Sequence, residues 1–124
     1  MPFVRGNQAV VHEIHGARFA SYVRLATGSR DLAAWRGEIP AGTVAPEHVI
    51  SAEEVFYVLS GRIRLTIDGE TAELGAGDAA VAPADATLAV SNPTGEPAHF
   101  WVTTQVGLSA VLPDGSTITP PWAN

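Results

Sequence analysis

Short segments of alternating apolar and polar residues, each closed by a turn signal, are the feature that most restricts the fold of this chain. In the clearest segment Ile63, Leu65 and Ile67 alternate with polar neighbours, and Asp68-Gly69 follows directly. A period of two is that of a strand with one buried face, and Asp-Gly is a strong signal for a tight hairpin. Similar runs recur at roughly the 8–12-residue spacing of sandwiches and barrels. The pattern predicts an all-β domain but does not separate a jelly roll from an immunoglobulin-like sandwich.

No stretch keeps a helical apolar period over three turns, so strands account for the regular structure that we expect. The tail from Pro113 contains Pro120-Pro121-Trp122, and we expect it to run extended along the surface. The segments predicted as strands are 10–14, 18–25, 32–39, 54–60, 62–67, 70–74, 79–83, 87–91, 98–104 and 108–112.

The stretch from Gly42 to Gly61 combines a histidine, a glutamate pair and a run of strand formers. Its spacing is glycine, five residues, His48, five residues, Glu54, six residues, Gly61. Ile50 lies two residues after the histidine. Because side chains alternate along a strand, Glu54 and Phe56 are expected to share one face of it.

A second stretch, from Gly77 to Asn92, contains Pro83, Asp85 and Leu88 at fixed intervals. Together the two stretches resemble the paired motifs of the cupin family, small β-barrels that often hold a metal ion. The resemblance covers about residues 38 to 92 by motif. It implies an all-β, cupin-like double-stranded β-helix, that is, a jelly-roll barrel. Asp85 takes the place of a motif glycine, and aspartate tolerates the left-handed backbone that such a turn requires.

The resemblance also implies a metal site that this chain has partly lost. In the family two histidines of the first motif, its glutamate and the last histidine of the second share one metal. Here Ile50 and Leu88 replace two of the four ligands, and aliphatic side chains cannot solvate a dication. His48 and Glu54 alone would make a poor chelate, since catalytic sites usually have three protein ligands. We therefore predict no firmly bound metal; any metal present would be held by His48 and Glu54.

A histidine from a neighbouring strand is the remaining way to complete a metal site. His99 is the best candidate because it lies on an expected strand, and His12 and His15 are the others. The simpler interpretation of His99 is an exposed residue that alternates with Phe100 and Val102.

An inward Glu54 without a metal must be protonated or paired, because burial disfavours its charge. Desolvation should raise the pKa of Glu54, and a nearby His48 would oppose that shift. Such a pair is either a general acid–base couple or the remnant of a metal site, and the sequence leaves both open. The ordinary alternatives are a loop histidine and a solvated glutamate. The predicted cavity residues are His48, Ile50, Glu54, Phe56 and Leu88, with His48 and Glu54 as candidate catalytic residues.

Composition excludes several classes of protein. The 124 residues suit one domain, with the barrel over about 18–112 and an extended tail over 113–124. A net charge of −6 without a basic cluster argues against nucleic-acid binding. No apolar run is long enough to span a bilayer, and no signal peptide is evident, so we expect a cytoplasmic protein. There is no cysteine, hence no disulfide and no thiolate nucleophile.

We favour a small-molecule-binding cupin with an apolar barrel pocket and no intact metal site. Two alternatives stay open: a metal-dependent oxygenase or isomerase with a substitute ligand, and a metal-free isomerase or cyclase that uses His48 and Glu54 as acid and base. The family resemblance implies a homodimer. Fold alone cannot choose among these functions.

Overall fold

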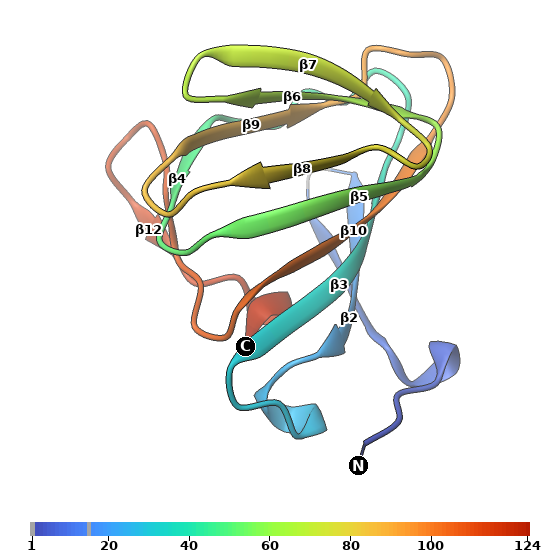
Figure 1. Ribbon diagram of the computed structural model, residues 1–124, viewed down its shortest axis with the longest axis vertical. Helices are drawn as coiled ribbons and strands as arrows, with labels where there is room; N and C mark the ends of the chain where they lie inside the picture. The colour runs from blue at the N-terminus through green and yellow to red at the C-terminus, as the bar shows by residue number, and fades with distance from the viewer. Residues whose placement is uncertain (1, 15) are drawn as a thin grey trace.

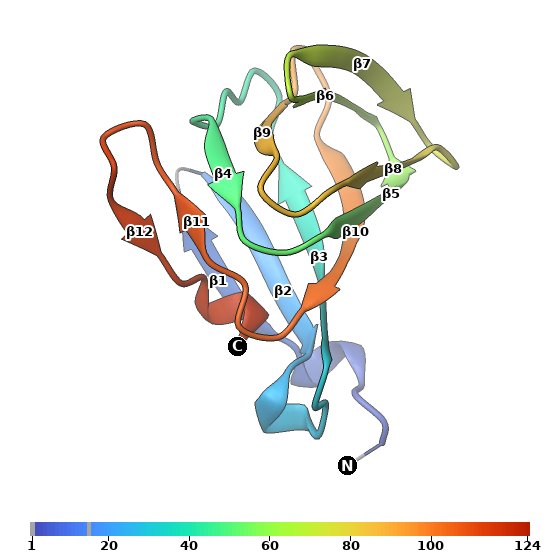
Figure 2. The same cartoon turned by 60° about the vertical axis from the view of Figure 1, so that its left-hand side comes forward.

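The protein folds into two antiparallel sheets that face each other, as a computed structural model describing residues 2–14 and 16–124 shows. One six-stranded sheet has the order β1-β2-β3-β10-β5-β8, and the other has the order β12-β11-β4-β9-β6-β7. Figures 1 and 2 show the sheets wrapping around a common interior. Between β3 and β11 the chain alternates between the two sheets, apart from the β6–β7 hairpin, and this is the jelly-roll arrangement predicted from the sequence.

The strands are short and follow the predicted segments closely. Three single 3₁₀ turns complete the structure: η1 (Gly6–Gln8), η2 (Leu25–Thr27) and η3 (Pro121–Ala123). The described residues include no helix with the length and hydropathy needed to cross a membrane. The strands are β1 (Val10–Ile14), β2 (Ala17–Val23), β3 (Leu32–Ile39), β4 (His48–Ile50), β5 (Glu54–Ser60), β6 (Arg62–Ile67), β7 (Glu70–Gly75), β8 (Ala79–Ala82), β9 (Thr87–Ser91), β10 (Ala98–Gln105), β11 (Ala110–Val111) and β12 (Thr117–Ile118).

Alternation along β5 decides which side chains face the interior. Phe56 and Val58 are 3% and 0% exposed, whereas Tyr57 between them is 46% exposed. Burying side chains of this size stabilises the fold by about 1.5–3 kcal/mol each. Phe56 therefore faces the interior, as predicted, and Tyr57 faces outward. Glu54 lies on the same face of β5 as Phe56, so its carboxyl group points into the apolar interior.

Three tight turns depend on backbone conformations that few residues adopt. At the β6–β7 hairpin Asp68 and Gly69 have φ of 49° and 83°, which is the geometry expected for an Asp-Gly hairpin turn. Gly61 has φ of 74°, and a Cβ there would lie 2.5 Å from the Pro97 carbonyl oxygen. Asp85 has φ of 70°, so it keeps the left-handed conformation at the motif position of a glycine.

The largest departures from prediction lie in β4 and the C-terminal segment. His48–Ile50 forms a strand that the sequence pattern did not predict, because Pro46 and Glu47 precede only three residues of alternation. The tail over 113–119 is exposed as expected, but the residues from Pro120 onward are not simply extended on the surface. There the chain turns through η3, and Ala123 is fully buried.

Candidate ligand cavity

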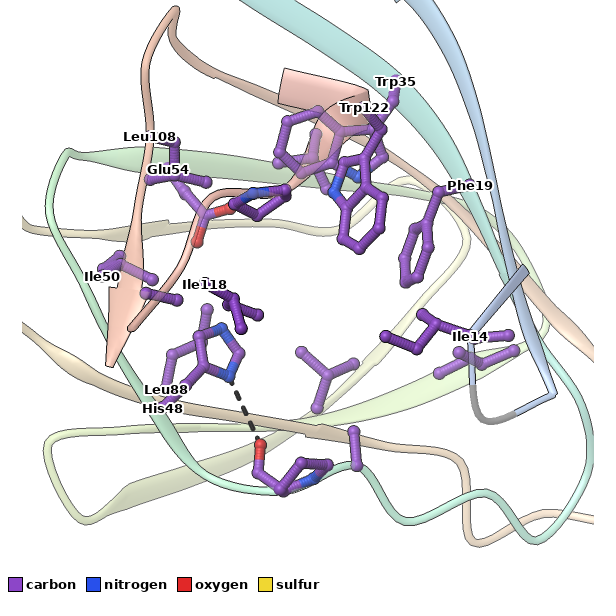
Figure 3. Close-up of a pocket in the computed structure, with 18 of the residues that line it drawn as sticks. Ile14, Phe19, Trp35, His48, Ile50, Glu54, Leu88, Leu108, Ile118 and Trp122 are labelled. Carbon is purple, nitrogen blue, oxygen red and sulfur yellow. Dashed lines mark hydrogen bonds between the residues drawn. The ribbon is translucent and has the colours of Figure 1, made fainter. Parts of the chain in front are cut away.

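A cavity of about 220 Å³ lies between the two sheets and is lined almost entirely by apolar side chains. All five residues predicted from the sequence to line it do so. Figure 3 shows Glu54 entering from one side and His48 from the other, with aromatic side chains along a third wall. The main lining residues are Phe19, Trp35, His48, Ile50, Glu54, Phe56, Leu88, Phe100, Leu108, Ile118, Pro120 and Trp122.

Glu54 is a buried acid whose side chain finds no hydrogen-bond partner among the described residues. Its side chain comes from the first position of β5, where alternation directs it inward, and the residue is only 4% exposed. Oε2 is buried and forms no hydrogen bond within the described part of the chain. Burial raises the pKa of Glu54 from 4.5 to about 7, as the sequence analysis predicted in direction. The carboxyl therefore changes its charge close to neutral pH.

His48 is the second polar group in the cavity. It lies on β4 directly opposite Leu88 of β9. Its Nδ1 is 3.3 Å from the carbonyl oxygen of Pro46. Because a carbonyl only accepts, that nitrogen must carry the proton, and Nε2 is then an acceptor. Burial lowers the pKa of His48, so the neutral ring is favoured.

The expected contact between these two groups is absent. Both residues are described by the structure, and neither a hydrogen bond nor an ion pair joins His48 to Glu54. His48 is hydrogen-bonded to the carbonyl oxygen of Pro46, in the loop just before β4. Glu54 Oε2 has no hydrogen-bond partner among the described residues. A pre-formed acid–base couple is therefore not what this site contains.

The aromatic wall is built partly from a segment that the sequence analysis placed on the surface. Trp122 stacks on Phe19 of β2, with ring centroids 4.6 Å apart and an interplanar angle of 18°. Its carbonyl oxygen accepts a hydrogen bond of 2.9 Å from the buried Ser21 hydroxyl. Pro120 is also buried and lines the cavity. The signal that was missed is an apolar Pro-Pro-Trp cluster after an otherwise polar tail.

The residues present do not fit a metal ion. Ile50 and Leu88, which replace two family ligands, are each 1% exposed and line the cavity. Among the described residues no three His, Cys, Asp or Glu side chains gather as a ligand set. A divalent ion would find one carboxylate and one imidazole inside a hydrocarbon wall, where its hydration is not replaced. We derive no chemistry through a metal.

Neither of the other described histidines, His12 and His99, completes the set. His99 lies on the outer face of its sheet, where Nδ1 is 2.9 Å from the Ser60 hydroxyl and Nε2 is 3.6 Å from Glu38. It lines a shallow groove there and not the cavity. His12 packs near Trp122, with ring centroids 6.0 Å apart. His15 lies outside the described residues.

Comparison with known proteins agrees with this architecture. A family model for the cupin domain matches residues 35–104, more than half of the chain. The chain is a cupin. No curated protein matches its sequence, so the family assignment comes with no transferred activity.

Several solved cupins have the same fold at low sequence identity. A RmlC-like cupin from Shewanella frigidimarina is 21% identical, with a TM-score of 0.74 over 85% of this chain and 90% of its own. The polyketide cyclase RemF from Streptomyces resistomycificus is 20% identical, with a TM-score of 0.75 over 85% and 79%. A predicted oxalate decarboxylase from Thermotoga maritima is 17% identical, with a TM-score of 0.72 over 83% and 97%. These similarities show the fold alone.

Proposed function

We propose that this cupin binds a small, largely apolar molecule in its barrel without the help of a metal ion. The observation that carries the proposal is the buried, unpartnered carboxyl of Glu54 in an aromatic and aliphatic cavity. A buried polar group without a hydrogen bond costs free energy, and a concave apolar pocket with few polar groups is the usual form of a ligand site. A ligand that pairs with Glu54 recovers that cost.

The charge of the cavity limits the class of ligand that it can bind. Its described lining residues include no Arg or Lys, so nothing there neutralises an anion. Oxalate, named for one structural neighbour, is a dianion and does not suit this site without a metal. The proposed ligand is therefore neutral or cationic.

The test is to recover the ligand and to block its site. Native mass spectrometry of the purified protein should show a small apolar molecule that leaves on denaturation. A neutral dye, N-phenyl-1-naphthylamine, should bind with a rise in its fluorescence. Ile118→Trp, at the mouth of the cavity, should weaken dye binding at least about tenfold, equivalent to about 1.4 kcal/mol. Val111→Trp is the matched control, since Val111 is 39% exposed on the adjacent strand and does not line the cavity. Equal binding by both variants would place the dye elsewhere.

A second candidate function is metal-free proton transfer by Glu54. The observation that favours it is the pKa of about 7, which suits a general acid–base group near neutral pH. His48 would then accept a hydrogen bond from the substrate and not drive Glu54. Incubation of the recovered ligand in D₂O should lead to deuterium uptake that Glu54→Gln abolishes. Uptake at the same rate in both proteins would exclude this role.

We also propose a homodimer formed through the outer face of the β5–β8 edge. Four apolar residues are exposed there: Val55 (42%), Tyr57 (46%), Leu59 (41%) and Val81 (56%). Val55 and Val81 are direct cross-strand partners, so the patch is continuous. An exposed apolar sheet edge favours association with a second copy. Light scattering should give a dimer at micromolar concentration and a monomer for Tyr57→Lys; a monomeric wild type would contradict the proposal.

A further inference from the structure

We propose that the ligand of this cavity is a hydrophobic amine in its protonated form, with the Glu54 carboxylate as its counterion. The inference rests on the proposed binding function and adds the chemical class of the ligand. Three features carry it: the hydrogen-bonding character of the polar groups, the charge of the lining, and the aromatic walls.

The two titratable groups of the cavity, His48 and Glu54, both offer acceptors. Nδ1 of His48 donates to Pro46, which leaves Nε2 as an acceptor. In Figure 3 that second nitrogen is turned away from Pro46, toward the interior. An ionised Glu54 only accepts, and its Oε2 has no donor among the described residues. A ligand that supplies N–H donors matches this arrangement, whereas a ketone or an ether does not.

The charge of the site selects a cation among the possible donors. Glu54 is the one acidic residue of the described lining, and that lining contains no Arg or Lys to neutralise it. An alcohol and an ammonium group can both donate a hydrogen bond to this carboxylate. Only the ammonium group also brings a positive charge, whose Coulomb attraction to the carboxylate is strong in a cavity of low dielectric constant.

The walls favour a cation with an apolar body. Trp35, Phe56 and Phe100 are buried in the core beside the cavity, and the Phe19–Trp122 stack forms a further wall. Aromatic faces carry negative charge density that attracts an ammonium group within about 6 Å. The hydrocarbon part of an amine would lie against the same walls and bury its surface.

Three probes of matched shape test the inference at pH 8. They are 2-phenylethylamine, which is cationic, 2-phenylethanol, which is neutral, and phenylacetate, which is anionic. Trp35 and Trp122 line the cavity, so tryptophan fluorescence reports binding directly. We expect the amine to bind at least about tenfold more tightly than the alcohol, equivalent to about 1.4 kcal/mol, because the ammonium group adds a Coulomb attraction to the buried carboxylate. Phenylacetate should bind most weakly.

The variant Glu54→Gln should remove the preference for the amine. Its affinity for 2-phenylethylamine should fall to that for 2-phenylethanol, while binding of the alcohol changes less than about twofold, within the margin of side-chain replacement at constant shape. Glu53→Gln, an exposed neighbour, is the matched control and should leave both affinities unchanged. If Glu54→Gln does not fold by circular dichroism, the ranking of probes on the wild type decides the question.

The outcomes separate this inference from the proposed function. Equal wild-type affinity for amine and alcohol, or an amine preference that survives in Glu54→Gln, overturns the amine assignment and leaves the apolar pocket intact. The same holds if the neutral dye binds and none of the three probes does. If neither dye nor probes bind, both the inference and the proposed function fail.

Discussion

The two motif stretches each bury one polar side chain, and the two side chains have opposite surroundings. Asn92 is fully buried, and its amide donates to the carbonyl oxygens of Ile39 at 3.2 Å and Glu96 at 2.7 Å. Its Oδ1 accepts from the backbone N–H and the hydroxyl of Thr94, at 3.0 and 2.7 Å. Glu54 is 4% exposed and its Oε2 has no partner in the described residues.

The hydrogen bonding of Asn92 and Glu54 distinguishes a structural buried polar group from a candidate functional one. Native proteins satisfy nearly all buried polar atoms, and those left over need an explanation. Asn92 joins the end of β3 to the turn after β9, so it contributes to the fold. The Glu54 side chain forms no hydrogen bond among the described residues, and it lies in a cavity, which is why we propose a ligand as its partner.

The largest expected effect is a gain in metal affinity when two further ligands are introduced beside His48 and Glu54. Ile50 lies two residues from His48 on β4, and Leu88 pairs directly with His48 across the sheet. Ile50→His together with Leu88→His should therefore complete a four-ligand set and raise the affinity for zinc or nickel by orders of magnitude. Isothermal titration calorimetry checks this, with each single variant as control. A folded double variant that binds no metal would mean that Glu54 does not face these positions.

Removal of Asn92 should cause the largest loss of stability. Asn92→Ala removes the amide donor to the Ile39 and Glu96 carbonyl oxygens and the acceptor of the Thr94 N–H, and each group left unsatisfied costs about 1–3 kcal/mol. The Glu96 oxygen keeps one donor, the Thr94 hydroxyl. We expect the free energy of unfolding to fall by about 4 kcal/mol in total. Urea denaturation measures it, with the exposed Asn7→Ala as a control that stays within about 0.5 kcal/mol. A small loss would show that these hydrogen bonds contribute little.

Glu54→Gln should have a smaller effect on stability, of opposite sign and dependent on pH. The unfolded chain releases this proton near pH 4.5 and the folded protein near pH 7. Between these values the unfolded state binds fewer protons, so the wild type loses stability as pH rises, by about 3 kcal/mol in all. Gln does not ionise and avoids this loss. Denaturation at pH 8 should therefore show a more stable variant, and at pH 4 a difference below about 1 kcal/mol, since both side chains are then neutral. Glu53→Gln should show neither trend.

Local alternation predicted an all-β domain, and the spacing of the two motifs identified it as a barrel. Motif spacing also placed His48, Ile50, Glu54 and Leu88 in the cavity, and the parity of β5 then added Phe56. The sequence did not predict the wall formed by Trp122 and Phe19, because that contact joins the two ends of the chain. The family resemblance also made His48 the expected partner of Glu54, whereas His48 is hydrogen-bonded to the Pro46 carbonyl oxygen, two residues away in the sequence. Local patterns cannot specify such long-range or competing contacts.

The most direct test of the central claim is the titration of Glu54 itself. Carbon-detected NMR of the side-chain carboxyl, assigned by comparison with Glu54→Gln, follows its ionisation in the ligand-free protein. A buried carboxyl without a partner predicts a midpoint near pH 7. A midpoint at or below the ordinary value of 4.5 would show that Glu54 is solvated or paired within the chain. That result would contradict the proposal that Glu54 is an unpaired carboxyl group available to a ligand.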